Sequence, residues 1–349
     1  MGRFSSKLYS ALEGLSFDDV LLLPRYSEVK LDSINLTTDI VKGFKLKTPI
    51  LSSPMDTVTG REVALSLGKM GGLGVLPRNI SIKEAVKTIE EAKNEKIPIA
   101  AAVGPFDDKR VKILVDKGID LIVIDTAHGH SKNVIEATKR FKREYEIPVM
   151  SGNVATGEGA EALISAGADS LRVGIGSGHA CITREVTGVG VPQLTAIAWV
   201  ADVAREYEVS VIADGGLEKP SDIIKALAAG ANAVMLGYLI AKSEEAPGNL
   251  LVVNDRKYKL YRGMGSRSAL AKGSMRYGEF KKVPEGVEGF IEITGSLSSI
   301  IENIVNSIKQ AMGYIGASSI TELWEKALFV KITEAGRYES KARGFSLMR

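Results

Sequence analysis

The sequence predicts an α/β protein of the (β/α)8 class, a TIM barrel in which eight parallel strands each lead into a helix. Eight short runs of β-branched and small apolar residues recur along the 349-residue chain. They are apolar almost throughout instead of alternating, which is typical of strands covered on both faces. Amphipathic stretches separate them at intervals of roughly 20–30 residues, which indicates a parallel sheet. Eight such units favour a closed barrel over an open sheet.

The expected strands can be placed in order along the chain. They lie at 48–55, 71–77, 97–104, 120–127, 148–155, 170–175, 209–216 and 233–238. A capping box from Ser81 to Glu84 marks the start of a helix. After it, apolar residues recur at helical spacing, at Ile82, Ala85, Val86, Ile89 and Ala92.

The chain is expected to form one domain over 1–349, with the barrel core at about 48–315, because barrels of this size commonly fold as a unit. Two connections interrupt the regular alternation of strands and helices. They are a glycine-rich segment at 176–192, here called the cysteine loop, and a segment at 239–296, here called the flap region. A helical pattern resumes near Leu297. Loops this long are usually functional. In this fold the loops that follow the strands form the mouth of the active site.

The last two expected strands end in glycines, at Gly215-Gly216 and at Gly237. A residue without a Cβ lets backbone N–H groups approach an anion closely. Because the last two loops of this fold typically hold a phosphate, we interpret these glycines as a phosphate site. The alternative is that they form tight turns without a ligand.

Charge and composition exclude several classes of protein. With 45 Lys+Arg against 42 Asp+Glu, the net charge is only +3, which is too small for strong electrostatic attraction to a nucleic-acid backbone. No apolar run approaches eighteen residues, and the N-terminus lacks the apolar core of a secretory signal. The chain has a single cysteine, Cys181, so no intrachain disulfide can form. We expect a cytoplasmic protein that partners neither nucleic acid nor membrane.

Cys181 is the candidate nucleophile. By base rate a lone cysteine is a small buried hydrophobe. This one lies among glycines after a strand, beside Thr183 and Arg184. A thiol in a polar, cationic and partly exposed position can act as a nucleophile, and its place at the predicted mouth favours catalysis.

Two other patterns are interpreted as non-sites. The glycines at 174–178 are misplaced for a dinucleotide fingerprint and fall in the sixth unit of the barrel, so we reject a Rossmann fold. His128 and His130 have no nearby cysteine or glutamate cluster, so we expect a polar loop and no zinc. In the flap region, Arg276-Tyr277 and Glu285 form either a solvated turn or a lid over the mouth.

In these residues and in the motifs around them, the sequence resembles the family of inosine-5′-monophosphate (IMP) dehydrogenases and guanosine-5′-monophosphate (GMP) reductases. The similarity covers nearly the whole chain, from GLSFDDVLLLP at 14–24 to ITEAGRYES at 332–340. Its strongest blocks are SSPMDTVT (52–59), DTAHGHS (125–131), GNVAT (152–156), GIGSGHACITREVTGVGVPQ (174–193), IADGG (212–216), EEAPG (244–248) and YRGMGS (261–266). The resemblance implies a (β/α)8 barrel that assembles as a homotetramer.

The resemblance also implies the roles of the site residues. Cys181 would attack C2 of the purine, and Thr183 with Arg276 and Tyr277 would activate water. Residues that would contact the nucleotide are Ser53, Met55, His179, Asp214, Gly216, Gly237, Tyr238, Tyr261, Met264, Gly265 and Glu285. Asp125, Asn153 and Gly174 would contact NAD. The carbonyls of Gly176, Gly178 and Cys181 resemble a potassium site.

The pair Arg276-Tyr277 favours the dehydrogenase, because only that enzyme hydrolyses a covalent intermediate. The chain would then oxidise IMP to XMP with NAD. Several features depart from the family pattern. One expected helix stands where most dehydrogenases insert a pair of CBS modules, which is a reductase-like trait. His179 and Tyr238 replace the usual phosphate-binding serines, and Lys341 falls where a neighbouring subunit completes the potassium site.

Three alternatives stay open. The first is a GMP reductase, which converts GMP and NADPH to IMP and ammonia. The second is a noncatalytic barrel that binds purine nucleotides, suggested by the changed phosphate residues. The third is a sugar-phosphate isomerase, which would explain the glycines but neither Cys181 nor the flap region.

Overall fold

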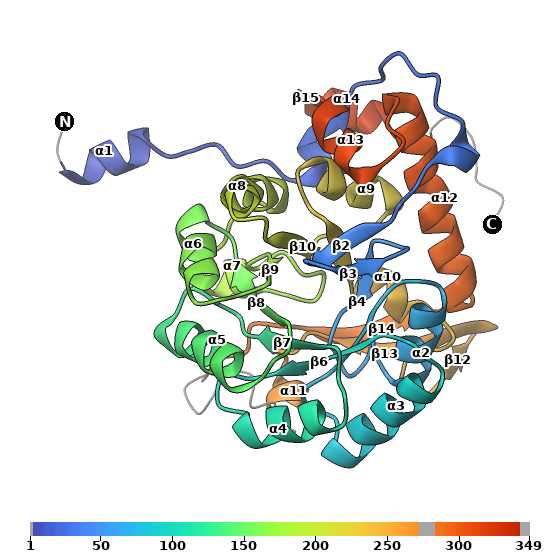
Figure 1. Cartoon of the computed structure of the whole chain (residues 1–349). Helices are drawn as coiled ribbons and strands as arrows, with labels where there is room; N and C mark the ends of the chain where they lie inside the picture. Colours follow the sequence, from blue (N-terminus) through green and yellow to red (C-terminus); the bar gives the residue numbers. More distant parts are fainter. Residues whose placement is uncertain (1–2, 272–282, 343–349) are drawn as a thin grey trace.

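The computed structural model describes residues 3–271 and 283–342 and confirms the predicted (β/α)8 barrel (Figure 1). Its eight parallel strands are β4 (Ile50–Ser52), β5 (Gly74–Leu76), β6 (Ile99–Val103), β7 (Leu121–Asp125), β8 (Val149–Val154), β9 (Ser170–Val173), β10 (Ser210–Asp214) and β11 (Ala233–Leu236). They are hydrogen-bonded in the order β4-β11-β10-β9-β8-β7-β6-β5. Between β4 and the start of β5, the Ser52 N–H donates to the Leu73 carbonyl at 3.0 Å, and the Leu73 N–H donates to the Ile50 carbonyl at 3.0 Å. These bonds close the barrel.

One long helix follows each strand and covers the outside of the barrel (Figure 1). These helices are α2 (Arg61–Lys69), α3 (Ile82–Asn94), α4 (Asp108–Asp116), α5 (Lys132–Glu144), α6 (Gly157–Ser165), α8 (Gln193–Glu206), α9 (Pro220–Ala228) and α12 (Leu297–Ile315). The cap predicted for α3 is present, since the Ser81 hydroxyl accepts from the Glu84 N–H at 3.1 Å. Ala85, Ile89 and Ala92 are buried as expected, but Ile82 is exposed. It lies in the first turn, outside the face that meets the sheet.

An N-terminal hairpin closes one end of the barrel. Its strands are β2 (Thr38–Val41) and β3 (Phe44–Leu46), which pair antiparallel. Ile40, Val41 and Leu46 are buried in one cluster with the inward-facing residues of the barrel, which are Leu51, Leu73, Val75, Ala100, Leu121, Val123, Met150, Ile212, Ala233 and Met235. This apolar cluster fills the barrel interior. The opposite end, where the strands finish, is left for the site.

The chain termini add a second layer beside α9 and α12. From the N-terminus come α1 (Arg3–Tyr9), η1 (Phe17–Asp19), β1 (Val20–Leu22) and η2 (Leu31–Ser33). From the C-terminus come α13 (Ile320–Lys326), β15 (Phe329–Lys331) and α14 (Glu334–Glu339). Strands β1 and β15 pair antiparallel, so the two ends of the chain are tied together. Helix α1 projects away from the barrel (Figure 1).

The two long connections contain more regular structure than the sequence suggested. The cysteine loop includes α7 (Thr183–Thr187). The flap region begins with α10 (Tyr238–Ala241) and contains α11 (Arg267–Ala271) and an antiparallel sheet of β12 (Leu251–Val253), β13 (Arg256–Arg262) and β14 (Glu288–Glu292). Helix α12 begins at Leu297, as predicted.

Residues 95–98 connect α3 directly to β6, so one helix occupies this position, as expected, and no CBS modules are inserted there. Over the described residues, no helix has the length and apolar character needed to cross a membrane.

Candidate active site

A cavity at the carboxyl ends of the strands gathers most of the predicted site residues. Its lining includes Ser53, Met55, Asn153, Gly174, Gly176, Gly178, His179, Cys181, Thr183, Asp214, Tyr261, Met264, Gly265 and Glu285. They come from four strand ends, the cysteine loop and the flap region. The position matches the end of a TIM barrel where active sites form.

Cys181 lies at one end of a hydrogen-bonded chain of three side chains. Its Sγ is 3.1 Å from the Thr183 hydroxyl, which in turn donates to Glu285 Oε2 at 2.8 Å. Because the Thr183 proton is directed at the carboxylate, a neutral Cys181 must donate its S–H to the threonine oxygen. These two hydrogen bonds therefore offer a route for the thiol proton from Cys181 towards Glu285.

Backbone pairing brings Cys181 and Glu285 together across about a hundred residues of sequence. The Ile182 N–H donates to the Glu285 carbonyl at 3.0 Å, and the Val287 N–H donates to the Ala180 carbonyl at 3.0 Å. On the other side, the Glu285 N–H donates to the Gly265 carbonyl at 3.1 Å. The cysteine loop, the segment around Glu285 and the turn that carries Met264 and Gly265 thus form one antiparallel ladder.

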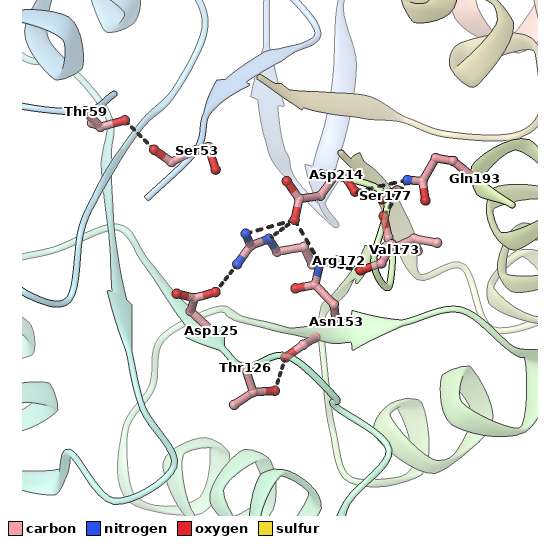
Figure 2. A network of polar contacts seen from close by, with 12 residues as sticks. Ser53, Thr59, Asp125, Thr126, Asn153, Arg172, Val173, Ser177, Gln193 and Asp214 are labelled. Carbon is pink, nitrogen blue, oxygen red and sulfur yellow. Dashed lines mark hydrogen bonds and ion pairs between the residues drawn. The ribbon is translucent and has the colours of Figure 1, made fainter. Parts of the chain in front are cut away.

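A polar network centred on Arg172, which lines the cavity, links four adjacent strands (Figure 2). Arg172 of β9 is 2% exposed and forms ion pairs with Asp125 of β7 and, at 2.8 Å, with Asp214 Oδ2 of β10. Asn153 of β8 donates to the same Asp214 oxygen at 2.8 Å. All these donors reach Oδ2, so Oδ1 of Asp214 has no donor among the described residues and is the oxygen left for a ligand hydroxyl.

The loops after β9 and β10 approach each other so closely that glycine is required. A Cβ on Gly174, whose φ is +145°, would lie 2.0 Å from the Asp214 carbonyl oxygen. A Cβ on Gly215, at φ +96°, would lie 2.5 Å from the Ser177 hydroxyl. Gln193 ties the same region by donating to the carbonyls of Val173 and Asp214 at 2.9 and 3.1 Å. These contacts fix the root of the cysteine loop.

The Tyr261 and His179 rings line the end of the cavity predicted to hold a phosphate, and the Tyr238 ring lies beside it. A Cβ on Gly237 would be 3.5 Å from the Tyr261 hydroxyl, so that backbone faces the phenol. Burial, reinforced by the charge of Asp214, raises the pKa of Tyr261, which keeps the phenol a neutral donor. The His179 ring stacks on Tyr238 with centroids 3.9 Å apart, and His179 Nδ1 is 3.0 Å from a Glu218 carboxylate oxygen.

A second, mainly apolar cavity of about 560 Å³ lies on the other side of Thr183 and Glu285. Its lining includes Ala127, His128, Ala155, Thr156, Ile175, Val189 and Val191. Burial, and then the neighbouring His130, lowers the pKa of His128, which favours the uncharged ring. The two cavities share Thr183 and Glu285 in their linings, so a ligand in each would meet beside Cys181.

Several predicted site residues lie away from the first cavity. Asp125 is 1% exposed and points at Arg172, below the cavity. Gly216 lines a neighbouring pocket with Ser177 and Gln193, and Tyr238 lines one with Lys242. Arg276 and Tyr277 lie outside the described residues.

The structure also places two residues at the site that the sequence analysis missed. Arg172 is the one charged residue of β9, a short buried strand, and a charge in such a strand was a usable signal. His128 was interpreted as part of a polar loop, yet it lines the apolar cavity. Its ring centroid is 6.3 Å from that of His130, and within the described ranges no group of three or more His, Cys, Asp or Glu is placed to hold a metal.

The predicted potassium ligands lie on the cysteine loop but share it with an arginine. Gly178 already accepts from the Cys181 N–H at 2.9 Å, while Gly176 has a φ of +72° and packs against Arg184. Arg184 donates to the carbonyls of Ile175, at 3.2 Å, and Val191. The carbonyls of Gly176 and Cys181 are the hard oxygen ligands that suit an alkali cation. The donor chemistry therefore fits potassium, with a half-buried guanidinium as an unusual neighbour.

Comparison with known proteins identifies relatives over almost the whole chain. Residues 14–343 match the family model described as the IMP dehydrogenase / GMP reductase domain. The inosine-5′-monophosphate dehydrogenase of Aquifex aeolicus is 37% identical, covering 97% of this chain and 96% of the relative. Those of Cryptosporidium parvum and Methanocaldococcus jannaschii are 38% and 36% identical, each with the same two coverages.

The lengths of these alignments agree with the direct link between α3 and β6. The alignment with the Aquifex protein spans 473 positions and that with the Cryptosporidium protein spans 386, whereas this chain has 349 residues. Both relatives therefore contain segments that have no counterpart here. On the family match and the identities over almost the whole chain, the chain belongs to the IMP dehydrogenase / GMP reductase family.

Proposed function

We propose that this protein oxidises IMP to XMP with NAD as the hydride acceptor, through a covalent bond between Cys181 and C2 of the purine. The observation that carries the proposal is the Cys181–Thr183–Glu285 chain at the junction of two cavities. The relatives named inosine-5′-monophosphate dehydrogenase support this direction of the reaction.

The reaction needs a nucleophile that loses its proton as it attacks. The S–H bond of Cys181 breaks, its proton passes towards Glu285 through Thr183, and the sulfur forms a bond to C2. C2 becomes tetrahedral, and its hydrogen departs with the electron pair as hydride. NAD, when bound, supplies the acceptor for that hydride. Water then replaces the sulfur at C2, which releases XMP and restores the thiol.

The remaining residues orient the nucleotide. Asp214 Oδ1 would accept from the ribose hydroxyls, because its other oxygen is already held by Arg172 and Asn153. Tyr261 and the backbone at Gly216 and Gly237 would hold the phosphate, with His179 and Tyr238 at its rim. Contacts to the base and its surroundings would come from Ser53, Met55, Met264, Gly265 and Glu285. Holding the nucleotide in this orientation keeps C2 close to Cys181, which lowers the barrier of the chemical step.

The residues of the apolar cavity would hold NAD, with its reacting end beside Cys181, where the two cavities meet. Asn153 and Gly174 line the first cavity near Thr183, and the apolar cavity beside His128 has the volume for the rest of a dinucleotide. Asp125 acts from below by holding Arg172. Potassium would bind the carbonyls of the cysteine loop. Arg276 and Tyr277, together with Thr183, would activate the hydrolytic water, as the resemblance implies.

A GMP reductase is the second candidate. It is favoured by the short chain without inserted modules. A side chain relay of this kind would also serve that reaction, in which hydride is added to C2 and ammonia departs. The difference is therefore one of direction and of cofactor.

The paired cofactor assay tests the proposal. The purified protein is mixed with IMP and NAD, and separately with GMP and NADPH, and the absorbance of the reduced cofactor is followed. We expect a rise in the first mixture and no change in the second. A fall confined to the second mixture would establish the reductase. Tight IMP binding without change in either mixture, and without alkylation of Cys181 by a nucleotide analogue, would leave a noncatalytic binding protein.

We also propose that the protein assembles as a homotetramer, the state that the family resemblance implies. Light scattering during size-exclusion chromatography would give the mass directly. A mass of one chain would contradict this.

A further inference from the structure

Arg262 is an almost completely buried arginine that lies near the active site without lining its cavity. It is the last residue of β13 and is 2% exposed. Its guanidinium forms a two-pronged contact with the Asp56 carboxylate through Nε, at 3.3 Å, and Nη2. The third nitrogen, Nη1, donates to the Ser268 hydroxyl at 2.9 Å. Burying a guanidinium is costly unless its donors are satisfied, so this arrangement needs every one of these contacts.

The contacts of Arg262 reach three segments that converge on the site. Asp56 directly follows Ser53 and Met55 on the loop after β4. Ser268 is the second residue of α11, the helix that follows Met264 and Gly265, and its hydroxyl donates to Glu288, the first residue of β14. Glu288 lies three residues after Glu285. One guanidinium therefore braces both chain segments that enter and leave the part of the flap region carrying Glu285.

The backbone ladder carries this bracing to the nucleophile. Immediately after Arg262, the Gly263 N–H donates to the Val287 carbonyl at 2.9 Å. The segment that it holds pairs next with Ala180 and Ile182, on either side of Cys181. A shift of β13 against the loop after β4 would move Glu285 relative to Thr183, where the contact is only 2.8 Å long. A displacement of about 1 Å at a reacting centre can lower the rate about a hundredfold.

We propose that Arg262 is a positioning residue that sets the distance between Glu285 and the Thr183–Cys181 pair while touching neither substrate nor cofactor. This inference deepens the proposed function and rests on it for its kinetic test. An arginine is required because its planar fork matches the Asp56 carboxylate with two bonds and leaves a third donor for Ser268, which a lysine cannot reproduce.

The test compares Arg262→Gln with Arg256→Gln. Arg256 lies on the same strand, is about half exposed and pairs loosely with Glu292 at 3.8 Å. We expect Arg262→Gln to lower kcat per titrated active site by about tenfold or more, with KM for IMP within about threefold, since nucleotide contacts stay in place. Arg262→Lys should recover little of the loss, and Arg256→Gln should behave as the wild type. Ser268→Ala, the mildest change, keeps the test possible if Arg262→Gln does not fold, and should give a smaller loss of kcat.

A double-mutant cycle with Glu285→Gln separates positioning from a general loss of stability. If Arg262 acts through Glu285, then Arg262→Gln in the Glu285→Gln background should lower kcat by less than about threefold. The same tenfold loss in both backgrounds would overturn the proposal. So would an equal fall in kcat and rise in KM.

Amide hydrogen exchange gives a readout that does not depend on turnover. The Glu285 and Val287 N–H groups are bonded in the ladder, so their exchange should speed up by about tenfold in Arg262→Gln while peptides from β6–β8 keep their protection. Unchanged exchange over 283–290 would contradict the proposal. If the wild type turns over neither nucleotide pair, the proposed function fails, and exchange alone then decides whether Arg262 positions Glu285.

Discussion

The Thr183 hydroxyl is placed to do two things at once, because it accepts from Cys181 and donates to Glu285. A serine would supply the same group, but the extra methyl of threonine restricts χ1 and so keeps the hydroxyl on this line. In the proposed reaction, the direction of the proton route is therefore set by one side chain between Cys181 and the Glu285 carboxylate.

Replacing the nucleophile should separate chemistry from binding. We expect Cys181→Ala to abolish turnover while IMP affinity stays within about tenfold, because the phosphate and ribose contacts come from other residues. Isothermal titration with IMP, alongside the NAD reduction assay, measures both quantities. A substantial residual rate in the variant would remove Cys181 from its assigned role.

Arg276 gives the sharpest distinction between the two candidate reactions. If it activates water, Arg276→Ala should still form the Cys181 adduct and reduce about one equivalent of NAD per site in a burst. The steady rate that follows should be about 10²–10⁴-fold slower than in the wild type, the usual cost of losing a general base. Stopped-flow absorbance resolves the two phases, and mass spectrometry should find a xanthylate-type adduct on the peptide that carries Cys181.

Two other outcomes of that experiment have different meanings. A variant without a burst would place Arg276 before or during hydride transfer. A variant that turns over at the wild-type rate would make the match to the family's Arg-Tyr pair incidental, and the reductase would become the better assignment.

At this scale the sequence predicted most of the residues that line the cavity, Cys181 among them, but it missed the buried arginines. Arg172 and Arg262 act through carboxylates that lie far away in the sequence, at Asp125, Asp214 and Asp56. No local spacing reveals such pairs. Only the closure of the barrel brings the strand ends together.

Among the elements, the barrel strands were predictable because their apolar runs are buried on both faces. The antiparallel sheet inside 239–296 was not, since every residue of β12 is exposed and its pattern resembles a loop. One local signal was present. Asn254 and Asp255 join β12 to β13 with φ values of +50° and +61°, the left-handed pair that a tight hairpin needs and that Asn and Asp tolerate best.

Helix α13 carries a cap whose strength should depend on acidity. The Glu322 carboxylate accepts from the backbone N–H and hydroxyl of Ser318, at 3.1 and 2.8 Å, and pairs with Lys326 at 2.8 Å. The Lys326 bond, followed by the Ser318 bonds, lowers the pKa of Glu322 to about 2 from an ordinary value of 4.5. A carboxylate with a lowered pKa stabilises the fold fully above 4.5, and that contribution disappears as the pH falls through about 2.

We therefore expect Glu322→Gln to have a lower melting temperature than the wild type at pH 7, with the gap closing between pH 4.5 and 2. Circular dichroism at a series of pH values measures the gap. Glu325→Gln, an exposed change on the same helix, is the control and should show no such trend. A gap of equal size at pH 7 and pH 2 would show that the charge of Glu322 is not what stabilises the cap.

For the whole molecule, the response to monovalent cations depends on how copies of the chain meet. Lys341 lies just beyond α14, and the resemblance puts this segment at the potassium loop of a neighbouring subunit. Its ammonium would occupy the charge position of the ion, so we expect weak activation by potassium over sodium in steady-state assays. Lys341→Ala should increase the dependence on potassium. Strong, saturable activation of the wild type would contradict this.

The arrangement of the whole molecule was predictable where it follows from repeated strand–helix units. It was not predictable where it depends on contacts between segments that are distant in the sequence. Eight similar units implied a barrel, and the strand order confirms it. The pairing of Ala180–Ile182 with the segment around Glu285 joins two irregular connections, whose sequences carry no periodicity that could have announced it.

The hairpin of β2 and β3 determines at which end of the barrel substrates and products can enter and leave. Because Ile40, Val41 and Leu46 fill the far end of the barrel, nothing can pass through its axis. Nucleotide, dinucleotide, water and both products must therefore enter and leave at the end where the strands finish. In the proposed reaction, the hydrolytic water needs the space that the reduced dinucleotide vacates. Because the floor is sealed, that dinucleotide would have to leave, and the water to enter, at the same end of the barrel.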